Sequence, residues 1–284
     1  MSAVIYYFSG TGNSLHVARE LERRIPESTL SPIVCLLRRQ RIEPEAESVG
    51  FVFPNFCMTL PIPFLDFLQK IDLAAAGYLF AVCTRGGTTS DEAFAYLDQL
   101  LQKQGRRLDA QLSITMPWNA PIGKENLTGE ATEERVTQLE AVMHEKLDLF
   151  SERVLAQEAY VPPDTDAGYD VPAWARLIYA LLPKSLNYGL HRRLYQNVVC
   201  FYSDRACVGC GTCQEVCLSG KIELVDGRPV WSDSIECYAC FACINFCPRQ
   251  AIQVESRFPI ESHTEETARY HHPSVTPREI AEQK

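Results

Sequence analysis

The sequence predicts a three-layer α/β domain followed by a small cysteine-rich domain that holds metal. Three observations predict this arrangement. Short apolar runs alternate with amphipathic stretches through residues 1–158, the pattern of a parallel sheet covered by helices. A loop rich in glycine and hydroxyl groups follows the first apolar run, and eight of the twelve cysteines lie within residues 207–247. The length of 284 residues is enough for about two such domains.

Composition and charge exclude several classes of protein. Hydrophobic residues at 46% and charged residues at 22% are typical of a globular protein and exclude wholesale disorder or a fibrous rod. The net charge of -9 disfavours binding to nucleic acid, which depends on clustered Lys and Arg. The longest apolar runs, such as residues 177–182, are far shorter than the roughly 20 residues that cross a bilayer, and residues 1–8 lack a basic leader. We therefore expect a cytoplasmic protein without a membrane span.

Five strands and four helices are expected to alternate in the first domain. The expected strands are Ala3–Phe8, Thr29–Leu37, Val49–Phe53, Tyr78–Thr84 and Ala110–Met116. The expected helices are Asn13–Arg24, Ile62–Ile71, Ser90–Gln104 and Glu130–Gln157. In such folds the strand-to-helix loops open at the carboxyl edge of the sheet, where ligands bind.

A helix-stopping stretch at residues 161–164, Val-Pro-Pro-Asp, predicts that the first domain ends near Tyr160. Beyond it, Trp174–Leu182 and Leu186–Tyr195 are expected to form two short helices that pack one domain against the other. The predicted division of the chain is an α/β domain at 1–158, a helical linker at 159–199, a metal-binding domain at 200–256 and a C-terminal tail at 257–284.

The cysteine-rich segment is an internal repeat, because residues 207–224 and 237–254 superimpose at an offset of 30. Asp226-Gly227, between the copies, predicts a tight hairpin turn. Each copy has the spacing Cys-x2-Cys-x2-Cys-x3-Cys, which holds a 4Fe-4S cluster and lends its fourth cysteine to the other cluster. Structural zinc is the alternative, but zinc usually has two well separated pairs of ligands. The sequence thus predicts one cluster on Cys207, Cys210, Cys213 and Cys247, and a second on Cys237, Cys240, Cys243 and Cys217.

Exchanged ligands imply that neither half of the repeat folds alone, so that the loss of one cysteine damages both clusters. Residues 200–256 resemble a bacterial ferredoxin with two 4Fe-4S clusters. Leu218 departs from that family, which usually has proline after the fourth cysteine.

The loop Ser9-Gly10-Thr11-Gly12-Asn13-Ser14 leads into the first expected helix. Its backbone N–H groups and hydroxyls can cradle an anion at the N-terminus of that helix. A P-loop requires a lysine, and none precedes Lys70. A dinucleotide loop requires a third glycine where Leu15 stands and an acidic residue in the second strand, which has none. A single phosphomonoester is therefore the expected ligand.

This loop, after Ile5-Tyr6-Tyr7-Phe8, resembles the FMN phosphate loop of flavodoxins, and the resemblance extends over residues 1–158. It implies a flavodoxin-like three-layer sandwich with a five-stranded parallel sheet in the order 2-1-3-4-5. It also implies that the flavin ring lies between the loops after the third and fourth strands, with the end of the fifth strand completing the pocket. The FMN-binding residues that it implies are Ser9, Gly10, Thr11, Gly12, Asn13, Ser14, Pro54, Asn55, Phe56, Met58, Thr84, Arg85, Gly86, Gly87, Trp118 and Asn119.

Together the two domains resemble the flavodoxin-ferredoxin fusion proteins of anaerobic microorganisms. The resemblance implies an electron-transfer protein that passes single electrons between two 4Fe-4S clusters and an FMN, and that exchanges electrons with a redox partner protein. One alternative is an FMN-dependent reductase of a small molecule, with its substrate near Asn55, Cys57 or Asn119. Another is a nucleic-acid-binding module that is stabilised by zinc and has no redox activity, which the acidic charge disfavours.

Residues 269–273, Arg-Tyr-His-His-Pro, also look like the tail of that fusion family. The adjacent histidines allow metal binding, whereas docking of the tail over a cluster is the interpretation that we favour. His16, on the first expected helix, is interpreted as a surface or packing residue.

Overall fold

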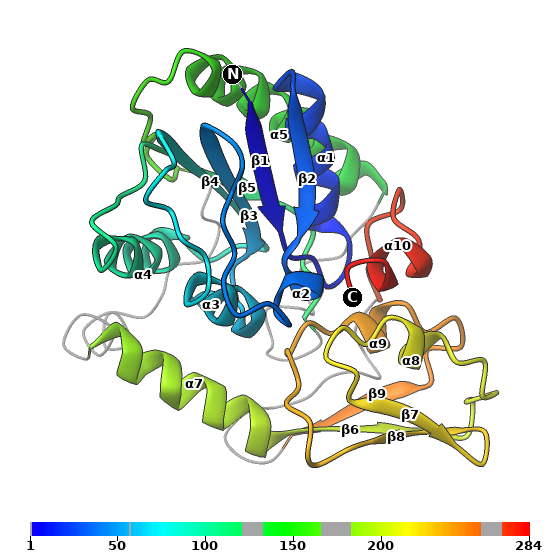
Figure 1. Ribbon diagram of the computed structural model, residues 1–284. Helices are drawn as coiled ribbons and strands as arrows, with labels where there is room; N and C mark the ends of the chain where they lie inside the picture. Colours follow the sequence, from blue (N-terminus) through cyan, green and yellow to red (C-terminus); the bar gives the residue numbers. More distant parts are fainter. Residues whose placement is uncertain (1, 57, 121–132, 166–182, 257–268) are drawn as a thin grey trace.

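A computed structural model describes residues 2–56, 58–120, 133–165, 183–256 and 269–284. An α/β domain lies above a smaller, cysteine-rich module, residues 199–256 (Figure 1). The C-terminal segment, residues 269–284, lies between them. Cys57 and the expected helix at Trp174–Leu182 lie outside the described residues. Within the described residues, no helix combines the length and the apolar character needed to cross a bilayer.

The α/β domain confirms the flavodoxin-like sandwich and its strand order. Its strands are β1 (Ala3–Tyr7), β2 (Ser28–Pro32), β3 (Ser48–Pro54), β4 (Tyr78–Arg85) and β5 (Ala110–Thr115). Its helices are α1 (Asn13–Arg24), α2 (Ile33–Leu36), α3 (Ile62–Leu68), α4 (Asp91–Gln102) and α5 (Glu133–Leu155). The strands are parallel, in the order β2-β1-β3-β4-β5. Helices α1 and α5 cover one face of the sheet, while α3 and α4 cover the other (Figure 1).

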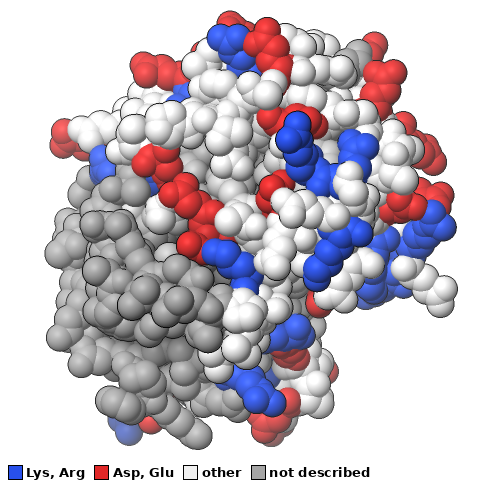
Figure 2. All heavy atoms as spheres, turned by 90° about the vertical axis from the view of Figure 1, so that its left-hand side faces the viewer, with Lys and Arg blue, Asp and Glu red and all other residues white. Residues whose placement is uncertain are grey.

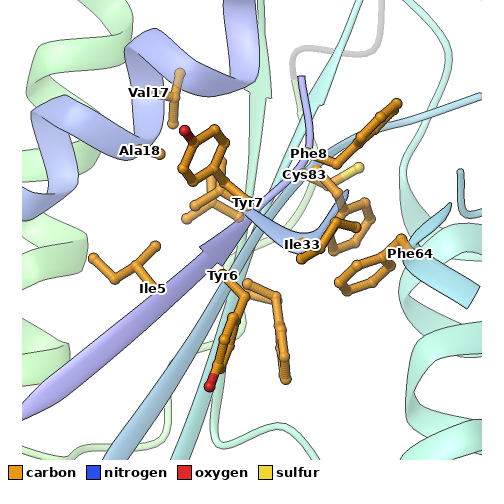
Figure 3. Close-up of a cluster of buried hydrophobic side chains, with 14 of the residues drawn as sticks. Ile5, Tyr6, Tyr7, Phe8, Val17, Ala18, Ile33, Phe64 and Cys83 are labelled. Atoms are coloured by element: carbon orange, nitrogen blue, oxygen red, sulfur yellow. The ribbon is translucent and has the colours of Figure 1, made fainter. Parts of the chain in front are cut away.

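Alternate side chains of β1 enter the two halves of the core, because successive residues of a strand point to opposite faces of the sheet. Ile5 and Tyr7 lie on the α1 side (Figure 3). On the other side, the rings of Tyr6 and Phe67 pack with their centroids 4.9 Å apart. The central strands are therefore buried on both faces, and their ends are held in fixed positions at the carboxyl edge of the sheet.

The expected strand at Thr29–Leu37 is wrong in its second half, where the chain forms the helical turn α2 after Pro32. A short apolar run does not by itself distinguish a strand from a buried helical turn. Here Ile33, Val34 and Leu36 are buried, and α2 packs against α3. The other described strands and helices of this domain lie where the sequence places them, within a few residues.

Gly50 in β3 is required by the ring that packs over it. A Cβ at this position would lie 2.3 Å from Cε2 of Phe80, in the middle of the sheet. We expect Gly50→Ala to lower the free energy of unfolding by about 1–3 kcal/mol, the usual cost of overpacking a core. Urea unfolding of the anaerobic protein measures this effect. Gly189→Ala, where a Cβ meets nothing within 4 Å, is the control, and an equal loss in both variants contradicts the prediction.

The cysteine-rich module is built on two small antiparallel sheets. One pairs β6 (Val199–Ser203), which follows helix α7 (Lys184–Val198), with β9 (Ile252–Ser256). The other is the hairpin of β7 (Ile222–Val225) and β8 (Arg228–Trp231). Asp226 and Gly227 have φ of 50° and 73°, which confirms the predicted turn between the two copies.

The internal repeat is also a repeat of backbone conformation. Each copy carries a short helical turn within its cysteine motif, α8 (Thr212–Glu215) in the first and α9 (Ala242–Asn245) in the second. Left-handed residues recur at the offset of 30, at Gly209, Gly211 and Gly220 in the first copy and at Ala239, Phe241 and Gln250 in the second. The two copies therefore present their cysteines on the same loop shape.

A helix that the sequence analysis missed, α10 (Pro277–Ala281), ends the chain. The hydroxyl of Thr276 accepts a hydrogen bond from the N–H of Glu279, whose carboxylate accepts from the N–H of Thr276 at 2.7 Å. Threonine followed by proline and then by glutamate at the third helical position is a capping-box signature, so the sequence did contain a signal for α10.

Charged side chains of both signs are intermixed on the face shown in Figure 2. Lys and Arg side chains on this face lie among Asp and Glu side chains, which offset their charge.

Candidate cofactor sites

The Ser9–Ser14 loop connects the end of β1 to the start of α1 at the carboxyl edge of the sheet. Gly12, at the N-cap position, has a φ of 100°, and α1 begins without a side-chain cap or an acidic residue in its first turn. The first backbone N–H groups of a helix have no partner within the helix and attract an anion. Ser9, Thr11 and Ser14 add buried hydroxyls to this helix end.

Hydrogen bonds join this loop to the ends of β4 and β5. The hydroxyls of Ser14 and Thr84 lie 2.7 Å apart, and the amide of Asn13 donates to the carbonyl of Pro117 at 3.1 Å. The Asn119 amide donates to the hydroxyl of Thr11. The structure thus brings together three of the loops that the sequence assigns to one ligand.

The loop after β3 joins the same group. The N–H of Asn55 donates to the carbonyl of Thr84 at 2.7 Å, and its side-chain amide donates to the carbonyl of Thr89 at 3.0 Å. The ring of Phe56 packs edge-on against Phe8, at 6.2 Å between centroids. Met58 is buried and left-handed, with a φ of 64°. The loop after β3 therefore lies next to the loop after β4 through Asn55, and next to Phe8, just before the Ser9–Ser14 loop, through Phe56.

The loop after β4 is held by side chains that sequence reasoning assigned differently or missed. Arg85, from which we expect either a backbone or a guanidinium donor to the flavin, places its guanidinium in a buried ion pair with Asp164. The ring of Trp118 packs on Gly86, where an added Cβ would lie 2.5 Å from Cε3 of the indole. Because the Arg85 guanidinium is paired with Asp164, we expect Gly86 and Gly87 to offer a ligand their backbone N–H groups.

The Ser9–Ser14 loop has the groups that a phosphate monoester requires. Ser9 Oγ accepts a hydrogen bond from the N–H of Gly12 at 3.1 Å, so the proton of this hydroxyl remains available for a phosphate oxygen. The uncapped start of α1 supplies further N–H donors, and its first turn contains no carboxylate that would repel an anion. The residues of this site therefore fit the phosphate end of FMN.

The first predicted set of cluster ligands surrounds one pocket. Cys207, Cys210, Cys213 and Cys247 all line it, with Ile252 and Arg249 at its wall. The N–H of Ala251 donates to Sγ of Cys247 at 3.3 Å, a contact of the kind that tunes the potential of a cluster. The fourth cysteine of the second copy thus lies with the first three of the first copy.

The second predicted set is also brought together, because the sulfur of Cys217 acts electrostatically on Cys237, Cys240 and Cys243. Burial raises the pKa of Cys237 to about 11 and that of Cys240 to about 12. Metal ligation requires thiolates, so iron must displace these protons. Every described cysteine is free of a disulfide. Both sets therefore fit the four-thiolate environment of a 4Fe-4S cluster.

The cysteine-rich module packs directly against the Ser9–Ser14 loop. A Cβ on Gly10 would lie 2.6 Å from both Cβ and the carbonyl oxygen of Cys240, so the two backbones are in contact. The ring of Tyr238 packs edge-on against Phe8, and the amide of Asn245 donates to the carbonyl of Asn119 at 2.9 Å. One predicted cluster ligand thus touches the predicted phosphate loop.

The C-terminal segment, residues 269–284, forms hydrogen bonds with both the α/β domain and the cysteine-rich module. The N–H of His272 donates to the carbonyl of Thr11 at 2.8 Å. The side chain of Gln283 exchanges two hydrogen bonds with the backbone of Ser9, at 2.8 and 3.0 Å. Lys284 donates to the carbonyl of Glu215 at 2.7 Å, on the cysteine-rich module. The tail therefore contacts the Ser9–Ser14 loop as well as the module.

His16 belongs to a cluster that sequence reasoning missed. Its ring stacks on His272 at 3.9 Å, and Nε2 of each ring lies within 2.9 Å of a Glu140 oxygen. The N–H of Ser274 donates to Nδ1 of His272, and burial lowers the pKa of His272. The ring is therefore neutral, and its proton lies on Nε2, which donates a hydrogen bond to Glu140. These hydrogen bonds account for the position of the His272 side chain.

Residues 206–252 match the family described as the 4Fe-4S dicluster domain. No curated protein matches the chain in sequence. Among solved structures, a flavodoxin from Streptococcus pneumoniae TIGR4 is 17% identical over 55% of this chain and 99% of its own, with a TM-score of 0.36. Rubredoxin oxygen:oxidoreductase from Desulfovibrio gigas is 16% identical over 55% of this chain and 36% of its own, with a TM-score of 0.34. An azoreductase from Bacillus anthracis str. Sterne is 12% identical over 54% and 98%, with a TM-score of 0.32.

The chain joins a flavodoxin-like α/β domain, identified by its strand order, to a 4Fe-4S dicluster domain.

Proposed function

We propose that this protein transfers electrons between an FMN on the α/β domain and two 4Fe-4S clusters on the cysteine-rich module. FMN exchanges one or two electrons, whereas each cluster exchanges one, so their combination couples the two kinds of chemistry. The observation that carries the proposal is the contact between Gly10 and Cys240, which places a predicted cluster ligand against the predicted phosphate loop.

The residues of the chain hold and shield these groups in this proposal. Ser9, Thr11 and Ser14 bind the phosphate with the N-terminus of α1, and the loops after β3 and β4 position the ring. The C-terminal segment covers the phosphate loop through His272 and Gln283 and excludes water from it.

The first set of cysteines includes the exposed Cys210, which lies beside the exposed Val208. In this proposal, a redox partner protein exchanges electrons at this edge of the cysteine-rich module.

An anaerobic kinetic experiment tests this electron relay, the transfer of electrons between the clusters and the FMN of one chain. The holoprotein is first shown to contain about eight irons and one FMN per chain, as two cluster motifs and one phosphate loop require. Its clusters are then reduced by a rapid pulse of a one-electron donor, and flavin absorbance is followed. We expect the flavin to be reduced at a rate that is unchanged by tenfold dilution, because the transfer occurs within one chain. Flavin that stays oxidised while the clusters are reduced, or a rate proportional to concentration, overturns the proposal.

Gly10→Ala tests the contact between the phosphate loop and the module. The new Cβ would overlap Cys240, so we expect the relay within the chain to slow and FMN to bind at least tenfold more weakly. Flavin fluorescence during dilution measures the affinity, and the same pulse experiment measures the relay. Gly189→Ala is the matched control, since a Cβ there has open space. Unchanged FMN affinity and rate in Gly10→Ala contradict the prediction.

A further inference from the structure

We infer that Arg269, at the start of the C-terminal segment, is a positioning residue that raises the reduction potential of the clusters by holding a buried positive charge between ligands of both. This inference rests on the proposed function, because it requires the two clusters to be bound at the assigned cysteines.

The tail is anchored over α9, the helical turn that contains Cys243 and precedes Cys247. The N–H of Tyr270 donates to Oδ1 of Asn245 at 3.0 Å, and the ring of His271 stacks on Phe246 at 4.3 Å. One end of the Arg269 guanidinium is fixed as well, because Nη2 donates to Oε1 of Gln253 at 2.8 Å and to the carbonyl of Ile252 at 3.2 Å. Ile252 itself lines the cysteine pocket.

The rest of the guanidinium has no hydrogen-bond partner among the described residues. Nε and Nη1 of Arg269 are buried and unsatisfied, which is a costly state for charged donors. The sulfurs of Cys247 and Cys243 act on this guanidinium as negative charges, while burial lowers the pKa of Arg269. In the predicted assignment Cys247 ligates the first cluster and Cys243 the second, so one cation faces a ligand of each.

A cation in this position favours the reduced form of a cluster, since reduction adds one negative charge. Net charge, hydrogen bonds to sulfur and solvent exposure are the levers by which a protein sets the potential of a 4Fe-4S cluster. Arg249 lines the same pocket but is exposed, so water screens its charge. Burial, rather than the mere presence of a basic residue, therefore distinguishes Arg269.

The test is an anaerobic redox titration of holoprotein variants, with iron and FMN counted per chain. Arg269→Gln removes the charge, Arg269→Lys keeps it, and Arg249→Gln removes an exposed charge beside the same pocket. We expect Arg269→Gln to keep its iron while the equilibrium constant for reducing the clusters falls about tenfold, or ~59 mV for one electron. That size follows from one charge acting across roughly 10 Å at an effective dielectric constant of about 20. Arg269→Lys should keep most of the wild-type potential, and Arg249→Gln should shift it clearly less.

Wild-type potentials in Arg269→Gln, or an equal shift in Arg249→Gln, overturn the inference. If Arg269→Gln loses iron, Arg269→Met, which has similar length without buried polar groups, is titrated in its place with the same two outcomes. Failure of the proposed function looks different, because wild-type protein would then lack the expected iron or fail to reduce its flavin. Intact clusters and an intact relay with unmoved potentials refute only the role of Arg269.

Discussion

Replacing Cys217 with alanine should reduce the iron content from about eight atoms per chain to about four or fewer. Cys217 is the fourth cysteine of the first motif, yet its sulfur acts on Cys237, Cys240 and Cys243 of the second. Its loss therefore opens the cluster of the second motif, and because the module shares one small core the other cluster is weakened too. Iron and sulfide analysis of anaerobically prepared protein measures the effect. Cys200→Ala, outside the repeat, should retain about eight irons.

Double variants show whether the ligands are exchanged between the two motifs. With exchanged ligands, Cys217→Ala combined with Cys237→Ala removes two ligands of the same cluster, so the iron content should stay close to that of Cys217→Ala alone. Cys217→Ala combined with Cys207→Ala damages both clusters and leaves almost none. If each motif served its own cluster, the two results would be reversed, and this reversal would refute the assignment.

Replacing Asp164 with alanine should lower the free energy of unfolding by about 3–5 kcal/mol, the cost of breaking a buried ion pair by removing one partner. The side chains of Arg85 and Asp164 are only 0% and 6% exposed. Without the carboxylate, the guanidinium stays buried and loses this counter-charge. Asp164 also accepts a hydrogen bond from the N–H of Ser90 at 3.2 Å, so the loop after β4 loses an anchor. We therefore expect weaker FMN binding together with the loss of stability.

Urea unfolding and FMN titration of the anaerobic protein measure both effects of Asp164→Ala. Glu43→Ala is the matched control, because Glu43 pairs with Arg41 on the surface, where both side chains are about two-thirds exposed. Exposed pairs contribute at most about 1 kcal/mol. Equal losses in the two variants would contradict the prediction, as would unchanged FMN affinity in Asp164→Ala.

The sequence predicts the sheet well, because buried parallel strands such as β3 and β4 are continuous apolar runs that flanking turns delimit. The sharpest motif, the repeated cysteine spacing, correctly locates the 4Fe-4S dicluster domain. The prediction at Ile33–Leu36 is wrong because this apolar run is short, and four apolar residues fit a buried helical turn as well as a strand.

Contacts between residues far apart in the chain account for what the sequence does not show. Asp164 lies 79 residues from Arg85, and no local pattern predicts their pairing. The stacking of His272 on His16 likewise depends on how the C-terminal segment docks. The capping box of α10 is local and was detectable, but the packing of α10 beside α8 was not.

The two copies of the cysteine repeat share one backbone template but differ in how readily the empty chain can adopt it. Left-handed backbone costs a residue with a Cβ about 1–2 kcal/mol, and the first copy places glycine at all three such positions. The second copy has Ala239, Phe241 and Gln250 there instead. We therefore expect iron binding to order the second loop, so that metal uptake there is itself a folding step. The first loop needs less rearrangement to adopt the same backbone conformation.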